Sequence, residues 1–150
     1  MSDIITLSEF QSKVNEGYYK VISRVYVASP LAASTEEGII ANMLSARDKC
    51  KTLNGLYMSR GIKFWAPHAY LPEFLNDNIP AERELGLSFG LKMLEMSEAV
   101  LVCGNRISSG MRGEIIKAAK YGTIIICEED GMIAELNAIL DTVSKAVGDA

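Results

Sequence analysis

A run of apolar residues without polar alternation, 99–103, constrains the fold of this chain more than any other feature. Alternation would indicate a strand with one solvated face, whereas a continuous apolar run is typical of a strand buried on both faces. Three further predicted strands, at 21–28, 62–66 and 123–127, are also mainly apolar. Because strands buried on both faces belong to parallel sheets, these runs predict an α/β fold.

Helical patterns separate the apolar runs. Apolar residues recur at helical spacing in the segments 7–18, 35–59, 81–96, 109–121 and 131–147. We expect one domain over residues 1–150, with a Rossmann-like (flavodoxin-like) parallel sheet of four to five strands and helices on both faces. In this prediction 21–28 is the first strand, and residues 1–20 form an N-terminal helical extension.

The segment 81–96 is apolar on more than one helical face. One face is expected to pack on the sheet and another on a second subunit, which predicts a homo-oligomer. Deep burial within a single chain would give the same pattern. The proline-punctuated segment before it, 67–80, is long enough to cover a site and is a candidate lid.

Composition narrows the classes of partner. The chain has 15 basic and 19 acidic residues, a net charge of -4 and no basic stripe, so a nucleic-acid polymer is not an expected partner. No apolar stretch reaches the ~20 residues of a membrane span. An odd number of cysteines without paired spacing, and a start without a secretory signal, predict a soluble cytoplasmic protein with reduced thiols. We expect no metal and no cofactor, since no ligand spacing is present.

Two loops mark the expected ligand site. Segment 29–32 follows the first predicted strand and 104–110 follows the third. In open α/β sheets the crevice at the carboxyl ends of such strands binds ligands. Ser108, Ser109 and Gly110 lie where the next helix begins, and free backbone amides there suit an anion or a sugar hydroxyl.

Glu114 lies four residues after Gly110, and its side chain leans back toward the helix start. It falls at the border of the predicted core stripe, which contains Met111 and Ile115. A half-shielded carboxylate beside a pocket makes a useful nucleophile or general base. A solvated glutamate favoured by the helix dipole is the simpler interpretation of the same spacing.

The other candidate residues have two interpretations each. Tyr26, near the end of the first strand, either points into the crevice or packs beneath a helix. His68, the only histidine, is a site residue or an ordinary surface residue. Arg83 and Arg106 either bind a phosphate or carboxylate or pair with neighbouring glutamates. No phosphate-binding Walker loop and no Gly-x-Ser-x-Gly elbow is present.

Several phrases in order resemble the nucleoside 2-deoxyribosyltransferase-like superfamily, in particular a small, often phage-encoded branch. They are Tyr-Val-Ala-Ser-Pro (26–30), Glu-Arg-Glu-Leu-Gly-Leu (82–87), Ser-Glu-Ala-Val-Leu-Val-Cys-Gly (97–104) and Ser-Ser-Gly-Met-Arg-Gly-Glu (108–114). The similarity covers roughly residues 21–127. The first twenty residues have no counterpart in it.

The resemblance implies that Glu114 is the nucleophile that attacks the anomeric carbon and that Tyr26 orients it. It also implies that Ser29 and the following loop meet the base or sugar, and that Ser109, Gly110 and Met111 hold the sugar or its phosphate. Neighbouring subunits often help to close such sites. The expected substrate-binding set is Ser29, Pro30, Leu31, His68, Arg83, Asn105, Arg106, Ser108, Ser109, Gly110 and Met111.

Two positions depart from the superfamily pattern. Glu98 stands where members often have an aspartate, and Gly90 stands where they have another acid. Glu98 is therefore the candidate for the acid that protonates the leaving base, with a structural cap as the alternative. The expected function is cleavage or transfer at the N-glycosidic bond of a (deoxy)nucleoside or its 5′-monophosphate. The alternatives are a non-catalytic module that senses or sequesters a nucleotide-derived signal, for example in phage anti-defence, and a scaffold with an empty crevice.

Overall fold

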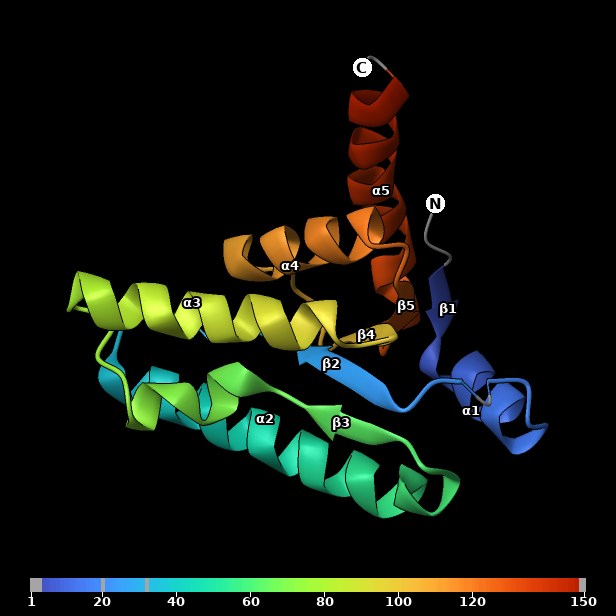
Figure 1. The fold of residues 1–150 in the computed structure, drawn as a ribbon, viewed down its shortest axis with the longest axis horizontal. Helices are drawn as coiled ribbons and strands as arrows, with labels where there is room; N and C mark the ends of the chain where they lie inside the picture. Colours follow the sequence, from blue (N-terminus) through green and yellow to red (C-terminus); the bar gives the residue numbers. More distant parts are fainter. Residues whose placement is uncertain (1–3, 20, 32, 149–150) are drawn as a thin grey trace.

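The computed structural model describes residues 4–19, 21–31 and 33–148, with side chains up to residue 145. It is an α/β fold with a five-stranded parallel sheet in the order β1-β5-β4-β2-β3 (Figure 1). The strands are β1 (Ile4–Thr6), β2 (Arg24–Ala28), β3 (Lys63–Trp65), β4 (Ala99–Val102) and β5 (Ile124–Cys127). The predicted Rossmann-like fold class is confirmed.

Helices cover both faces of the sheet (Figure 1). On one face α1 (Leu7–Asn15) and α2 (Glu36–Tyr57) pack on side chains such as Val25 and Val27. On the other face α3 (Pro80–Glu95), α4 (Ser109–Lys120) and α5 (Ile133–Gly148) pack on the alternate residues of the strands. Successive strand residues point to opposite faces, so each central strand contributes to both cores.

The first strand is not the one predicted. Ile4–Thr6 pairs with β5, so residues 1–20 are not a helical extension only, and 21–28 contains the second strand. Thr6 ends β1 and also caps α1, because its side chain accepts a hydrogen bond from the Glu9 N–H at 3.1 Å. A three-residue strand that runs directly into a capping box leaves almost no strand pattern in the sequence. Residues 1–3 and 20 lie outside the described residues.

The strand order places the predicted crevice at the centre of the sheet. From β2 the chain crosses to β3 on one side, and from β4 it crosses to β5 on the other. The carboxyl ends of β2 and β4 are neighbours, and the Cys103 N–H donates to the Ala28 carbonyl at 2.9 Å. This reversal is the point at which open α/β sheets bind ligands.

Helix α3 has a wide exposed apolar surface, so deep burial within the chain does not explain its composition. Of its residues only Leu94 is buried. Leu87 is 59% exposed and Phe89 49% exposed, and Leu85 and Leu91 lie on the same helix with similar exposure. In Figure 1 the end of α3 nearest to residue 80 extends beyond the strands.

An asparagine covers the outer edge of the sheet. Asn54 of α2 accepts from the Phe64 N–H at 2.7 Å and donates to the Phe64 carbonyl at 3.0 Å. Its amide therefore takes the place of a neighbouring strand beside β3. Such pairing protects an edge that would otherwise be open to another chain.

Candidate functional site

Tyr26 and Glu114 face each other at the carboxyl ends of the central strands. Tyr26 lies in β2 and is 4% exposed, and Glu114 lies in the second turn of α4 and is partly buried. A side-chain hydrogen bond joins them, with the phenol hydroxyl donating to the carboxylate. The structure thus brings together two residues 88 positions apart that the resemblance paired, and Glu114 is not the solvated residue of the simpler interpretation.

Burial controls the charge of this pair. It raises the pKa of Glu114 to about 7, and the hydrogen bond from Tyr26 only partly opposes that rise. The pKa of Tyr26 is raised too, by burial and by the neighbouring carboxylate. Tyr26 therefore stays protonated and remains a hydrogen-bond donor at neutral pH. The Glu114 carboxylate is weakly solvated, which is the state of an active nucleophile or base.

Two glycines leave space around the pair. A Cβ added at Gly110, one turn before Glu114, would meet no neighbouring atom within 4 Å. A Cβ on Gly90 of α3 would lie 3.7 Å from the Tyr26 hydroxyl. The position that carries a second acid in the resembled superfamily is therefore adjacent to this tyrosine, and here it bears no side chain.

At the start of α4, one predicted ligand-binding residue stabilises the helix itself. Ser108 is its N-cap, and its hydroxyl accepts from the Met111 N–H at 3.3 Å. The Met111 side chain is 1% exposed and belongs to the core. The amide and the side chain of Met111 are thus both engaged within the protein. Ser109 and Gly110 are exposed in the first turn of α4.

A second polar pair lies at the end of β2. The Ser29 hydroxyl is 2.7 Å from His68 Nε2, and both side chains are partly buried. Burial lowers the pKa of His68 to about 4, so the imidazole is neutral at pH 7. His68 is therefore not a surface histidine. The resemblance placed both residues in the substrate-binding set, and the structure shows that they are hydrogen-bond partners.

The other predicted site residues lie in the loops after β2 and β4 and in α3. The Leu31 carbonyl accepts from the Asn42 side chain at 2.9 Å, and Pro30 before it is partly exposed. Asn105 and Arg106 are exposed in the loop after β4. Arg83 is exposed in α3.

The alternative partners predicted for the two arginines are not observed. Within the described part of the chain, neither Arg83 nor Arg106 forms an ion pair.

Glu98 lies at the amino ends of the strands, on the side of the sheet opposite to Tyr26 and Glu114, so its predicted catalytic role is not supported. It precedes β4 and accepts from the backbone and side chains of Ser23 and Arg24, at distances of 2.8 to 3.3 Å. Burial acts to raise the pKa of Glu98, but these hydrogen bonds outweigh it and lower the pKa below its ordinary value. The structural interpretation of Glu98, as a cap at the strand entrance, is the one that the geometry favours.

Two charged residues, Arg47 and Glu128, hold the loops of the site, and no local sequence pattern predicted this role. Arg47 of α2 donates from Nε to the Ala69 carbonyl at 2.6 Å, pairs with Glu73 and lies 4.7 Å from the centre of the Tyr70 ring. These contacts hold the first half of the predicted lid 67–80, where the chain forms two short 3₁₀ turns, Pro67–Ala69 and Leu71–Glu73.

The second of these residues is Glu128, which follows β5. It pairs with Lys49 and accepts from the Gly104 N–H at 3.1 Å, so it holds the loop after β4. The left-handed φ of +82° at Gly104 is open to glycine at little cost.

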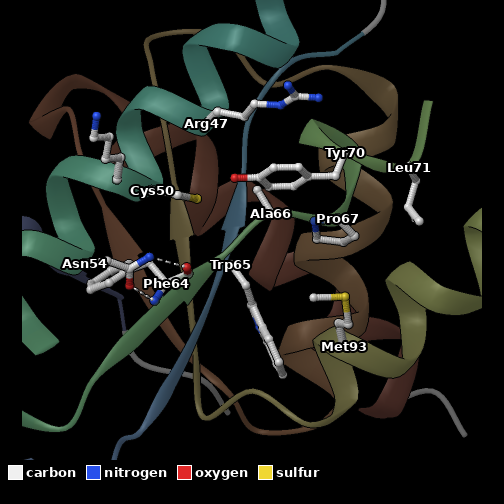
Figure 2. Close-up of a pocket in the computed structure, with 11 residues that line it drawn as sticks. Arg47, Cys50, Asn54, Phe64, Trp65, Ala66, Pro67, Tyr70, Leu71 and Met93 are labelled. Carbon is white, nitrogen blue, oxygen red and sulfur yellow. Dashed lines mark hydrogen bonds between the residues drawn. The ribbon is translucent and has the colours of Figure 1, made fainter. Parts of the chain in front are cut away.

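A pocket of about 380 Å³ lies at the outer edge of β3, away from the Tyr26–Glu114 pair (Figure 2). Tyr70 and Trp65 line it from different sides, and Arg47 lies above the tyrosine. Neither Tyr26 nor Glu114 lines it. Its walls are mostly apolar and come from α2, β3, the turns after β3 and Met93 of α3.

Three further findings bear on the expectations. Cys50, Cys103 and Cys127 are buried and free. Among the described residues no group of three or more His, Cys, Asp or Glu side chains has the arrangement of a metal site. None of the helices in the described ranges is both long and apolar enough to span a membrane.

Comparison with known proteins gives a family and no function. A search of curated proteins found no match. Residues 23–127, which run from the start of β2 to the end of β5, match the family described as Domain of unknown function (DUF7768). Both polar pairs lie within the matched range, whereas β1, α1 and α5 lie outside it. Because the match covers well over half of the 150 residues, the chain belongs to the DUF7768 family.

Proposed function

We propose that this protein cleaves or transfers at the N-glycosidic bond of a (deoxy)nucleoside or nucleoside 5′-monophosphate, with Glu114 as nucleophile. The observation that carries the proposal is the Tyr26–Glu114 pair at the reversal point of the sheet. A half-buried carboxylate with a single donor from a tyrosine is oriented and poorly solvated. Both properties favour attack on an electrophilic carbon.

The reaction has two displacements. A Glu114 carboxylate oxygen forms a bond to C1′ as the C1′–N bond breaks, and the electron pair leaves with the base. Water, or a second base in a transfer reaction, then attacks C1′ and releases the carboxylate, and the proton of the attacking water passes to solvent. Splitting one difficult substitution into two is the advantage of covalent catalysis.

Proton donation to the leaving base is the weak point of this site. Glu98 is held at the far edge of the sheet, and Gly90 offers no acid beside Tyr26. General acid catalysis contributes typically 10²- to 10⁴-fold. Slow turnover of substrates with poor leaving groups is therefore part of the proposal.

The absence of an acid at position 90 also favours a second candidate function. A crevice with an oriented carboxylate but no proton donor suits a module that binds a nucleotide-derived signal without cleaving it. Calorimetry with nucleotides and with cyclic or ADP-ribose-type ligands separates the two candidates. Tight stoichiometric binding with no product supports the module.

Base release is the direct test of the enzymatic proposal. Purified protein is incubated with a panel of nucleosides and 5′-monophosphates, and free base is measured by chromatography. Glu114→Gln keeps the size of the side chain and the hydrogen bond from Tyr26, so we expect at least about a 10³-fold loss without unfolding. Glu98→Gln is the matched control, with release within about twofold of wild type. Unchanged release in Glu114→Gln excludes this nucleophile.

We also propose that the protein acts as a homo-oligomer in the cytoplasm, on a small molecule rather than a nucleic-acid polymer. The exposed apolar side chains of α3 support self-association, because a monomer rarely exposes so many on one helix. Leu87→Glu tests it by sedimentation. A shift to a smaller species supports the proposal, and an unchanged monomer contradicts it.

A further inference from the structure

The pocket at the outer edge of β3 has no part in the chemistry proposed above, and the Tyr26–Glu114 pair does not line it. Its volume of about 380 Å³ is that of a site for a small molecule. We propose that this pocket is a second ligand site, which binds a small aromatic carboxylate. The inference does not rest on the proposed function.

One face of helix α2 forms the charged wall of the pocket. The α2 residues that line it are Arg47, Cys50, Lys51 and Asn54. Because they follow the first of them by three, four and seven positions, their side chains leave the same side of the helix. The other walls come from β3 and the turns after it, and Met93 lines the pocket from α3 (Figure 2). Elements from both faces of the sheet therefore enclose the pocket at the strand edge.

Two polar side chains in the walls already have partners within the protein. The Trp65 indole N–H donates to the Ser97 hydroxyl at 2.8 Å. The Asn54 amide is bonded at both ends to the Phe64 backbone, at 2.7 and 3.0 Å. Most of the other lining residues are aliphatic or aromatic. A ligand body with several polar groups would lose its hydrogen bonds to water here, so the walls favour an apolar body.

Two aromatic side chains, Trp65 and Tyr70, line the pocket from different sides (Figure 2). The Tyr70 ring is exposed, and the Arg47 guanidinium lies 4.7 Å from its centre. Trp65 is partly buried, and its hydrogen bond to Ser97 fixes the indole. Aromatic side chains pack well against flat apolar groups. A planar ring system is therefore the body that these walls fit best.

Both charged residues that line the pocket are basic. Arg47 pairs with Glu73 and donates to the Ala69 carbonyl, which leaves further N–H donors on its guanidinium. Lys51 forms no ion pair with any residue that the structure describes. Two cations and one carboxylate leave a single positive charge beside the pocket. A ligand with one negative charge balances it, whereas a phosphate would bring a higher charge to mostly apolar walls.

The spacing of the two cations suits a carboxylate. Arg47 and Lys51 are one turn apart on α2, so the two oxygens of one carboxylate can accept from both side chains. The ring system of the same ligand then lies against the aromatic walls.

Binding of trans-cinnamate to the whole protein tests the inference. This probe has a planar apolar body and one carboxylate, and cinnamamide is its neutral counterpart. Trp65 is the only tryptophan, so quenching of its fluorescence reports directly on the pocket. We expect saturable quenching by trans-cinnamate with a dissociation constant below about 1 mM, and one molecule bound per chain in calorimetry. Cinnamamide should bind about fivefold more weakly.

Two variants separate the charge of the site from its shape. Lys51→Gln should weaken trans-cinnamate binding about fivefold and leave cinnamamide binding unchanged. Tyr70→Ala removes an aromatic wall and should weaken the binding of both probes about tenfold. Lys120→Gln, in α4, makes the same change of net charge outside the pocket and should alter neither affinity by more than about twofold. Lys51 and Tyr70 are exposed, so both variants should fold, which melting temperatures check.

Three results would overturn the inference. The first is no binding of trans-cinnamate by the wild type at millimolar concentration. The second is equal affinity for the two probes, or an unchanged affinity for trans-cinnamate in Lys51→Gln, because either result removes the role of charge. The third is failure of both probes to bind together with a smaller species of Tyr70→Ala in sedimentation, which would assign the pocket to an interface between copies of the chain.

The variant Glu114→Gln keeps this inference separate from the proposed function. It should bind trans-cinnamate with wild-type affinity, and a loss of binding would place the probe in the other crevice and contradict the inference. A wild-type protein that binds trans-cinnamate as expected but releases no base refutes the proposed function and supports the second site.

Discussion

Two carboxylates at opposite edges of the same sheet have opposite environments. Glu98, at the amino ends of β2 and β4, accepts five hydrogen bonds from Ser23 and Arg24. Glu114, at the carboxyl ends, has only the tyrosine as a hydrogen-bond partner that affects its pKa. Burial acts to raise both pKa values. Hydrogen bonds overcome burial at Glu98 but not at Glu114.

The comparison shows how to distinguish a structural carboxylate from a reactive one. A fully satisfied carboxylate is stable in its charged form and is a poor nucleophile, because its lone pairs are occupied. A buried one with a single donor keeps lone pairs for chemistry and is less stable in its charged form. The two glutamates have the same side chain, so only their partners in the fold reveal the difference.

The largest effect on the comparison should come from Tyr26→Phe. It removes the one hydrogen bond that lowers the pKa of Glu114 and retains the packing of the ring. We expect base release at pH 7 to fall about 10²-fold, through misorientation and loss of the ionised form. In a pH–rate profile the rise in activity, near pH 7 in wild type, should move to higher pH. An unmoved midpoint would show that Tyr26 does not control this carboxylate.

The second effect is on the pH dependence of the free energy of unfolding. The folded pKa of Glu114, about 7, lies above the ordinary glutamate value, so the folded state binds the proton more tightly. Wild type should therefore lose stability relative to Glu114→Gln as pH rises from about 4.5 to about 7, by on the order of 2 kcal/mol. Urea denaturation of both proteins at four pH values measures it. The difference between them cancels His68, whose lowered pKa acts in the opposite direction over the same range.

A flat difference between the two proteins across that range would show that Glu114 titrates normally.

The third effect concerns Glu98→Gln. The contribution of Glu98 to stability should depend on pH in the direction opposite to that of Glu114. The folded pKa of Glu98 is lowered, so its contribution to stability is present above the ordinary glutamate pKa and is lost as pH falls through the folded value. At pH 7 we expect the variant to lose about 1 to 2 kcal/mol, since hydrogen bonds to a charged group are replaced by weaker ones. At pH 3 the gap between the variant and wild type should narrow. A gap that widens in acid contradicts the structural role.

The smallest effect is expected from Arg47→Ala, which loosens the carboxyl edge without touching either carboxylate. It removes the donor to the Ala69 carbonyl and the contact with the Tyr70 ring. We expect about 1 kcal/mol less stability and faster proteolysis within 67–73. Limited proteolysis with mass mapping locates the cut. Cleavage elsewhere, with this segment still protected, would mean that Arg47 does not hold it.

Most of the fold was predictable because its elements carry strong local patterns. The predicted strand 99–103 corresponds to β4, and 35–59 to α2 and the 3₁₀ turn after it, which ends at the left-handed Gly61. The core stripe Met111, Ile115 and Ala118 is buried as its spacing indicated. The strand β1 was missed because its three residues run directly into the capping box of α1, which leaves no flanking strand pattern.

The site was predictable only in part, because its contacts join distant positions. Helical spacing placed Glu114 at the border of the core, but only the fold could show which side chain it meets. Arg47 is 22 residues from Ala69, and nothing in its own segment distinguishes it from a surface arginine. The catalytic role of Glu98 came from the resemblance alone, whereas its position before a parallel strand already indicated the amino ends of the sheet, away from the predicted crevice.

Trapping the intermediate tests the central claim, that Glu114 bonds to C1′, most directly. A nucleoside with fluorine at C2′ forms the glycosyl ester but hydrolyses it slowly, because fluorine disfavours the positive charge that develops at C1′. After quenching in acid, peptide mass spectrometry locates the adduct. The account predicts one added sugar on the peptide that contains Glu114 and none in Glu114→Gln. Base release with no adduct, or an adduct on another residue, would contradict it.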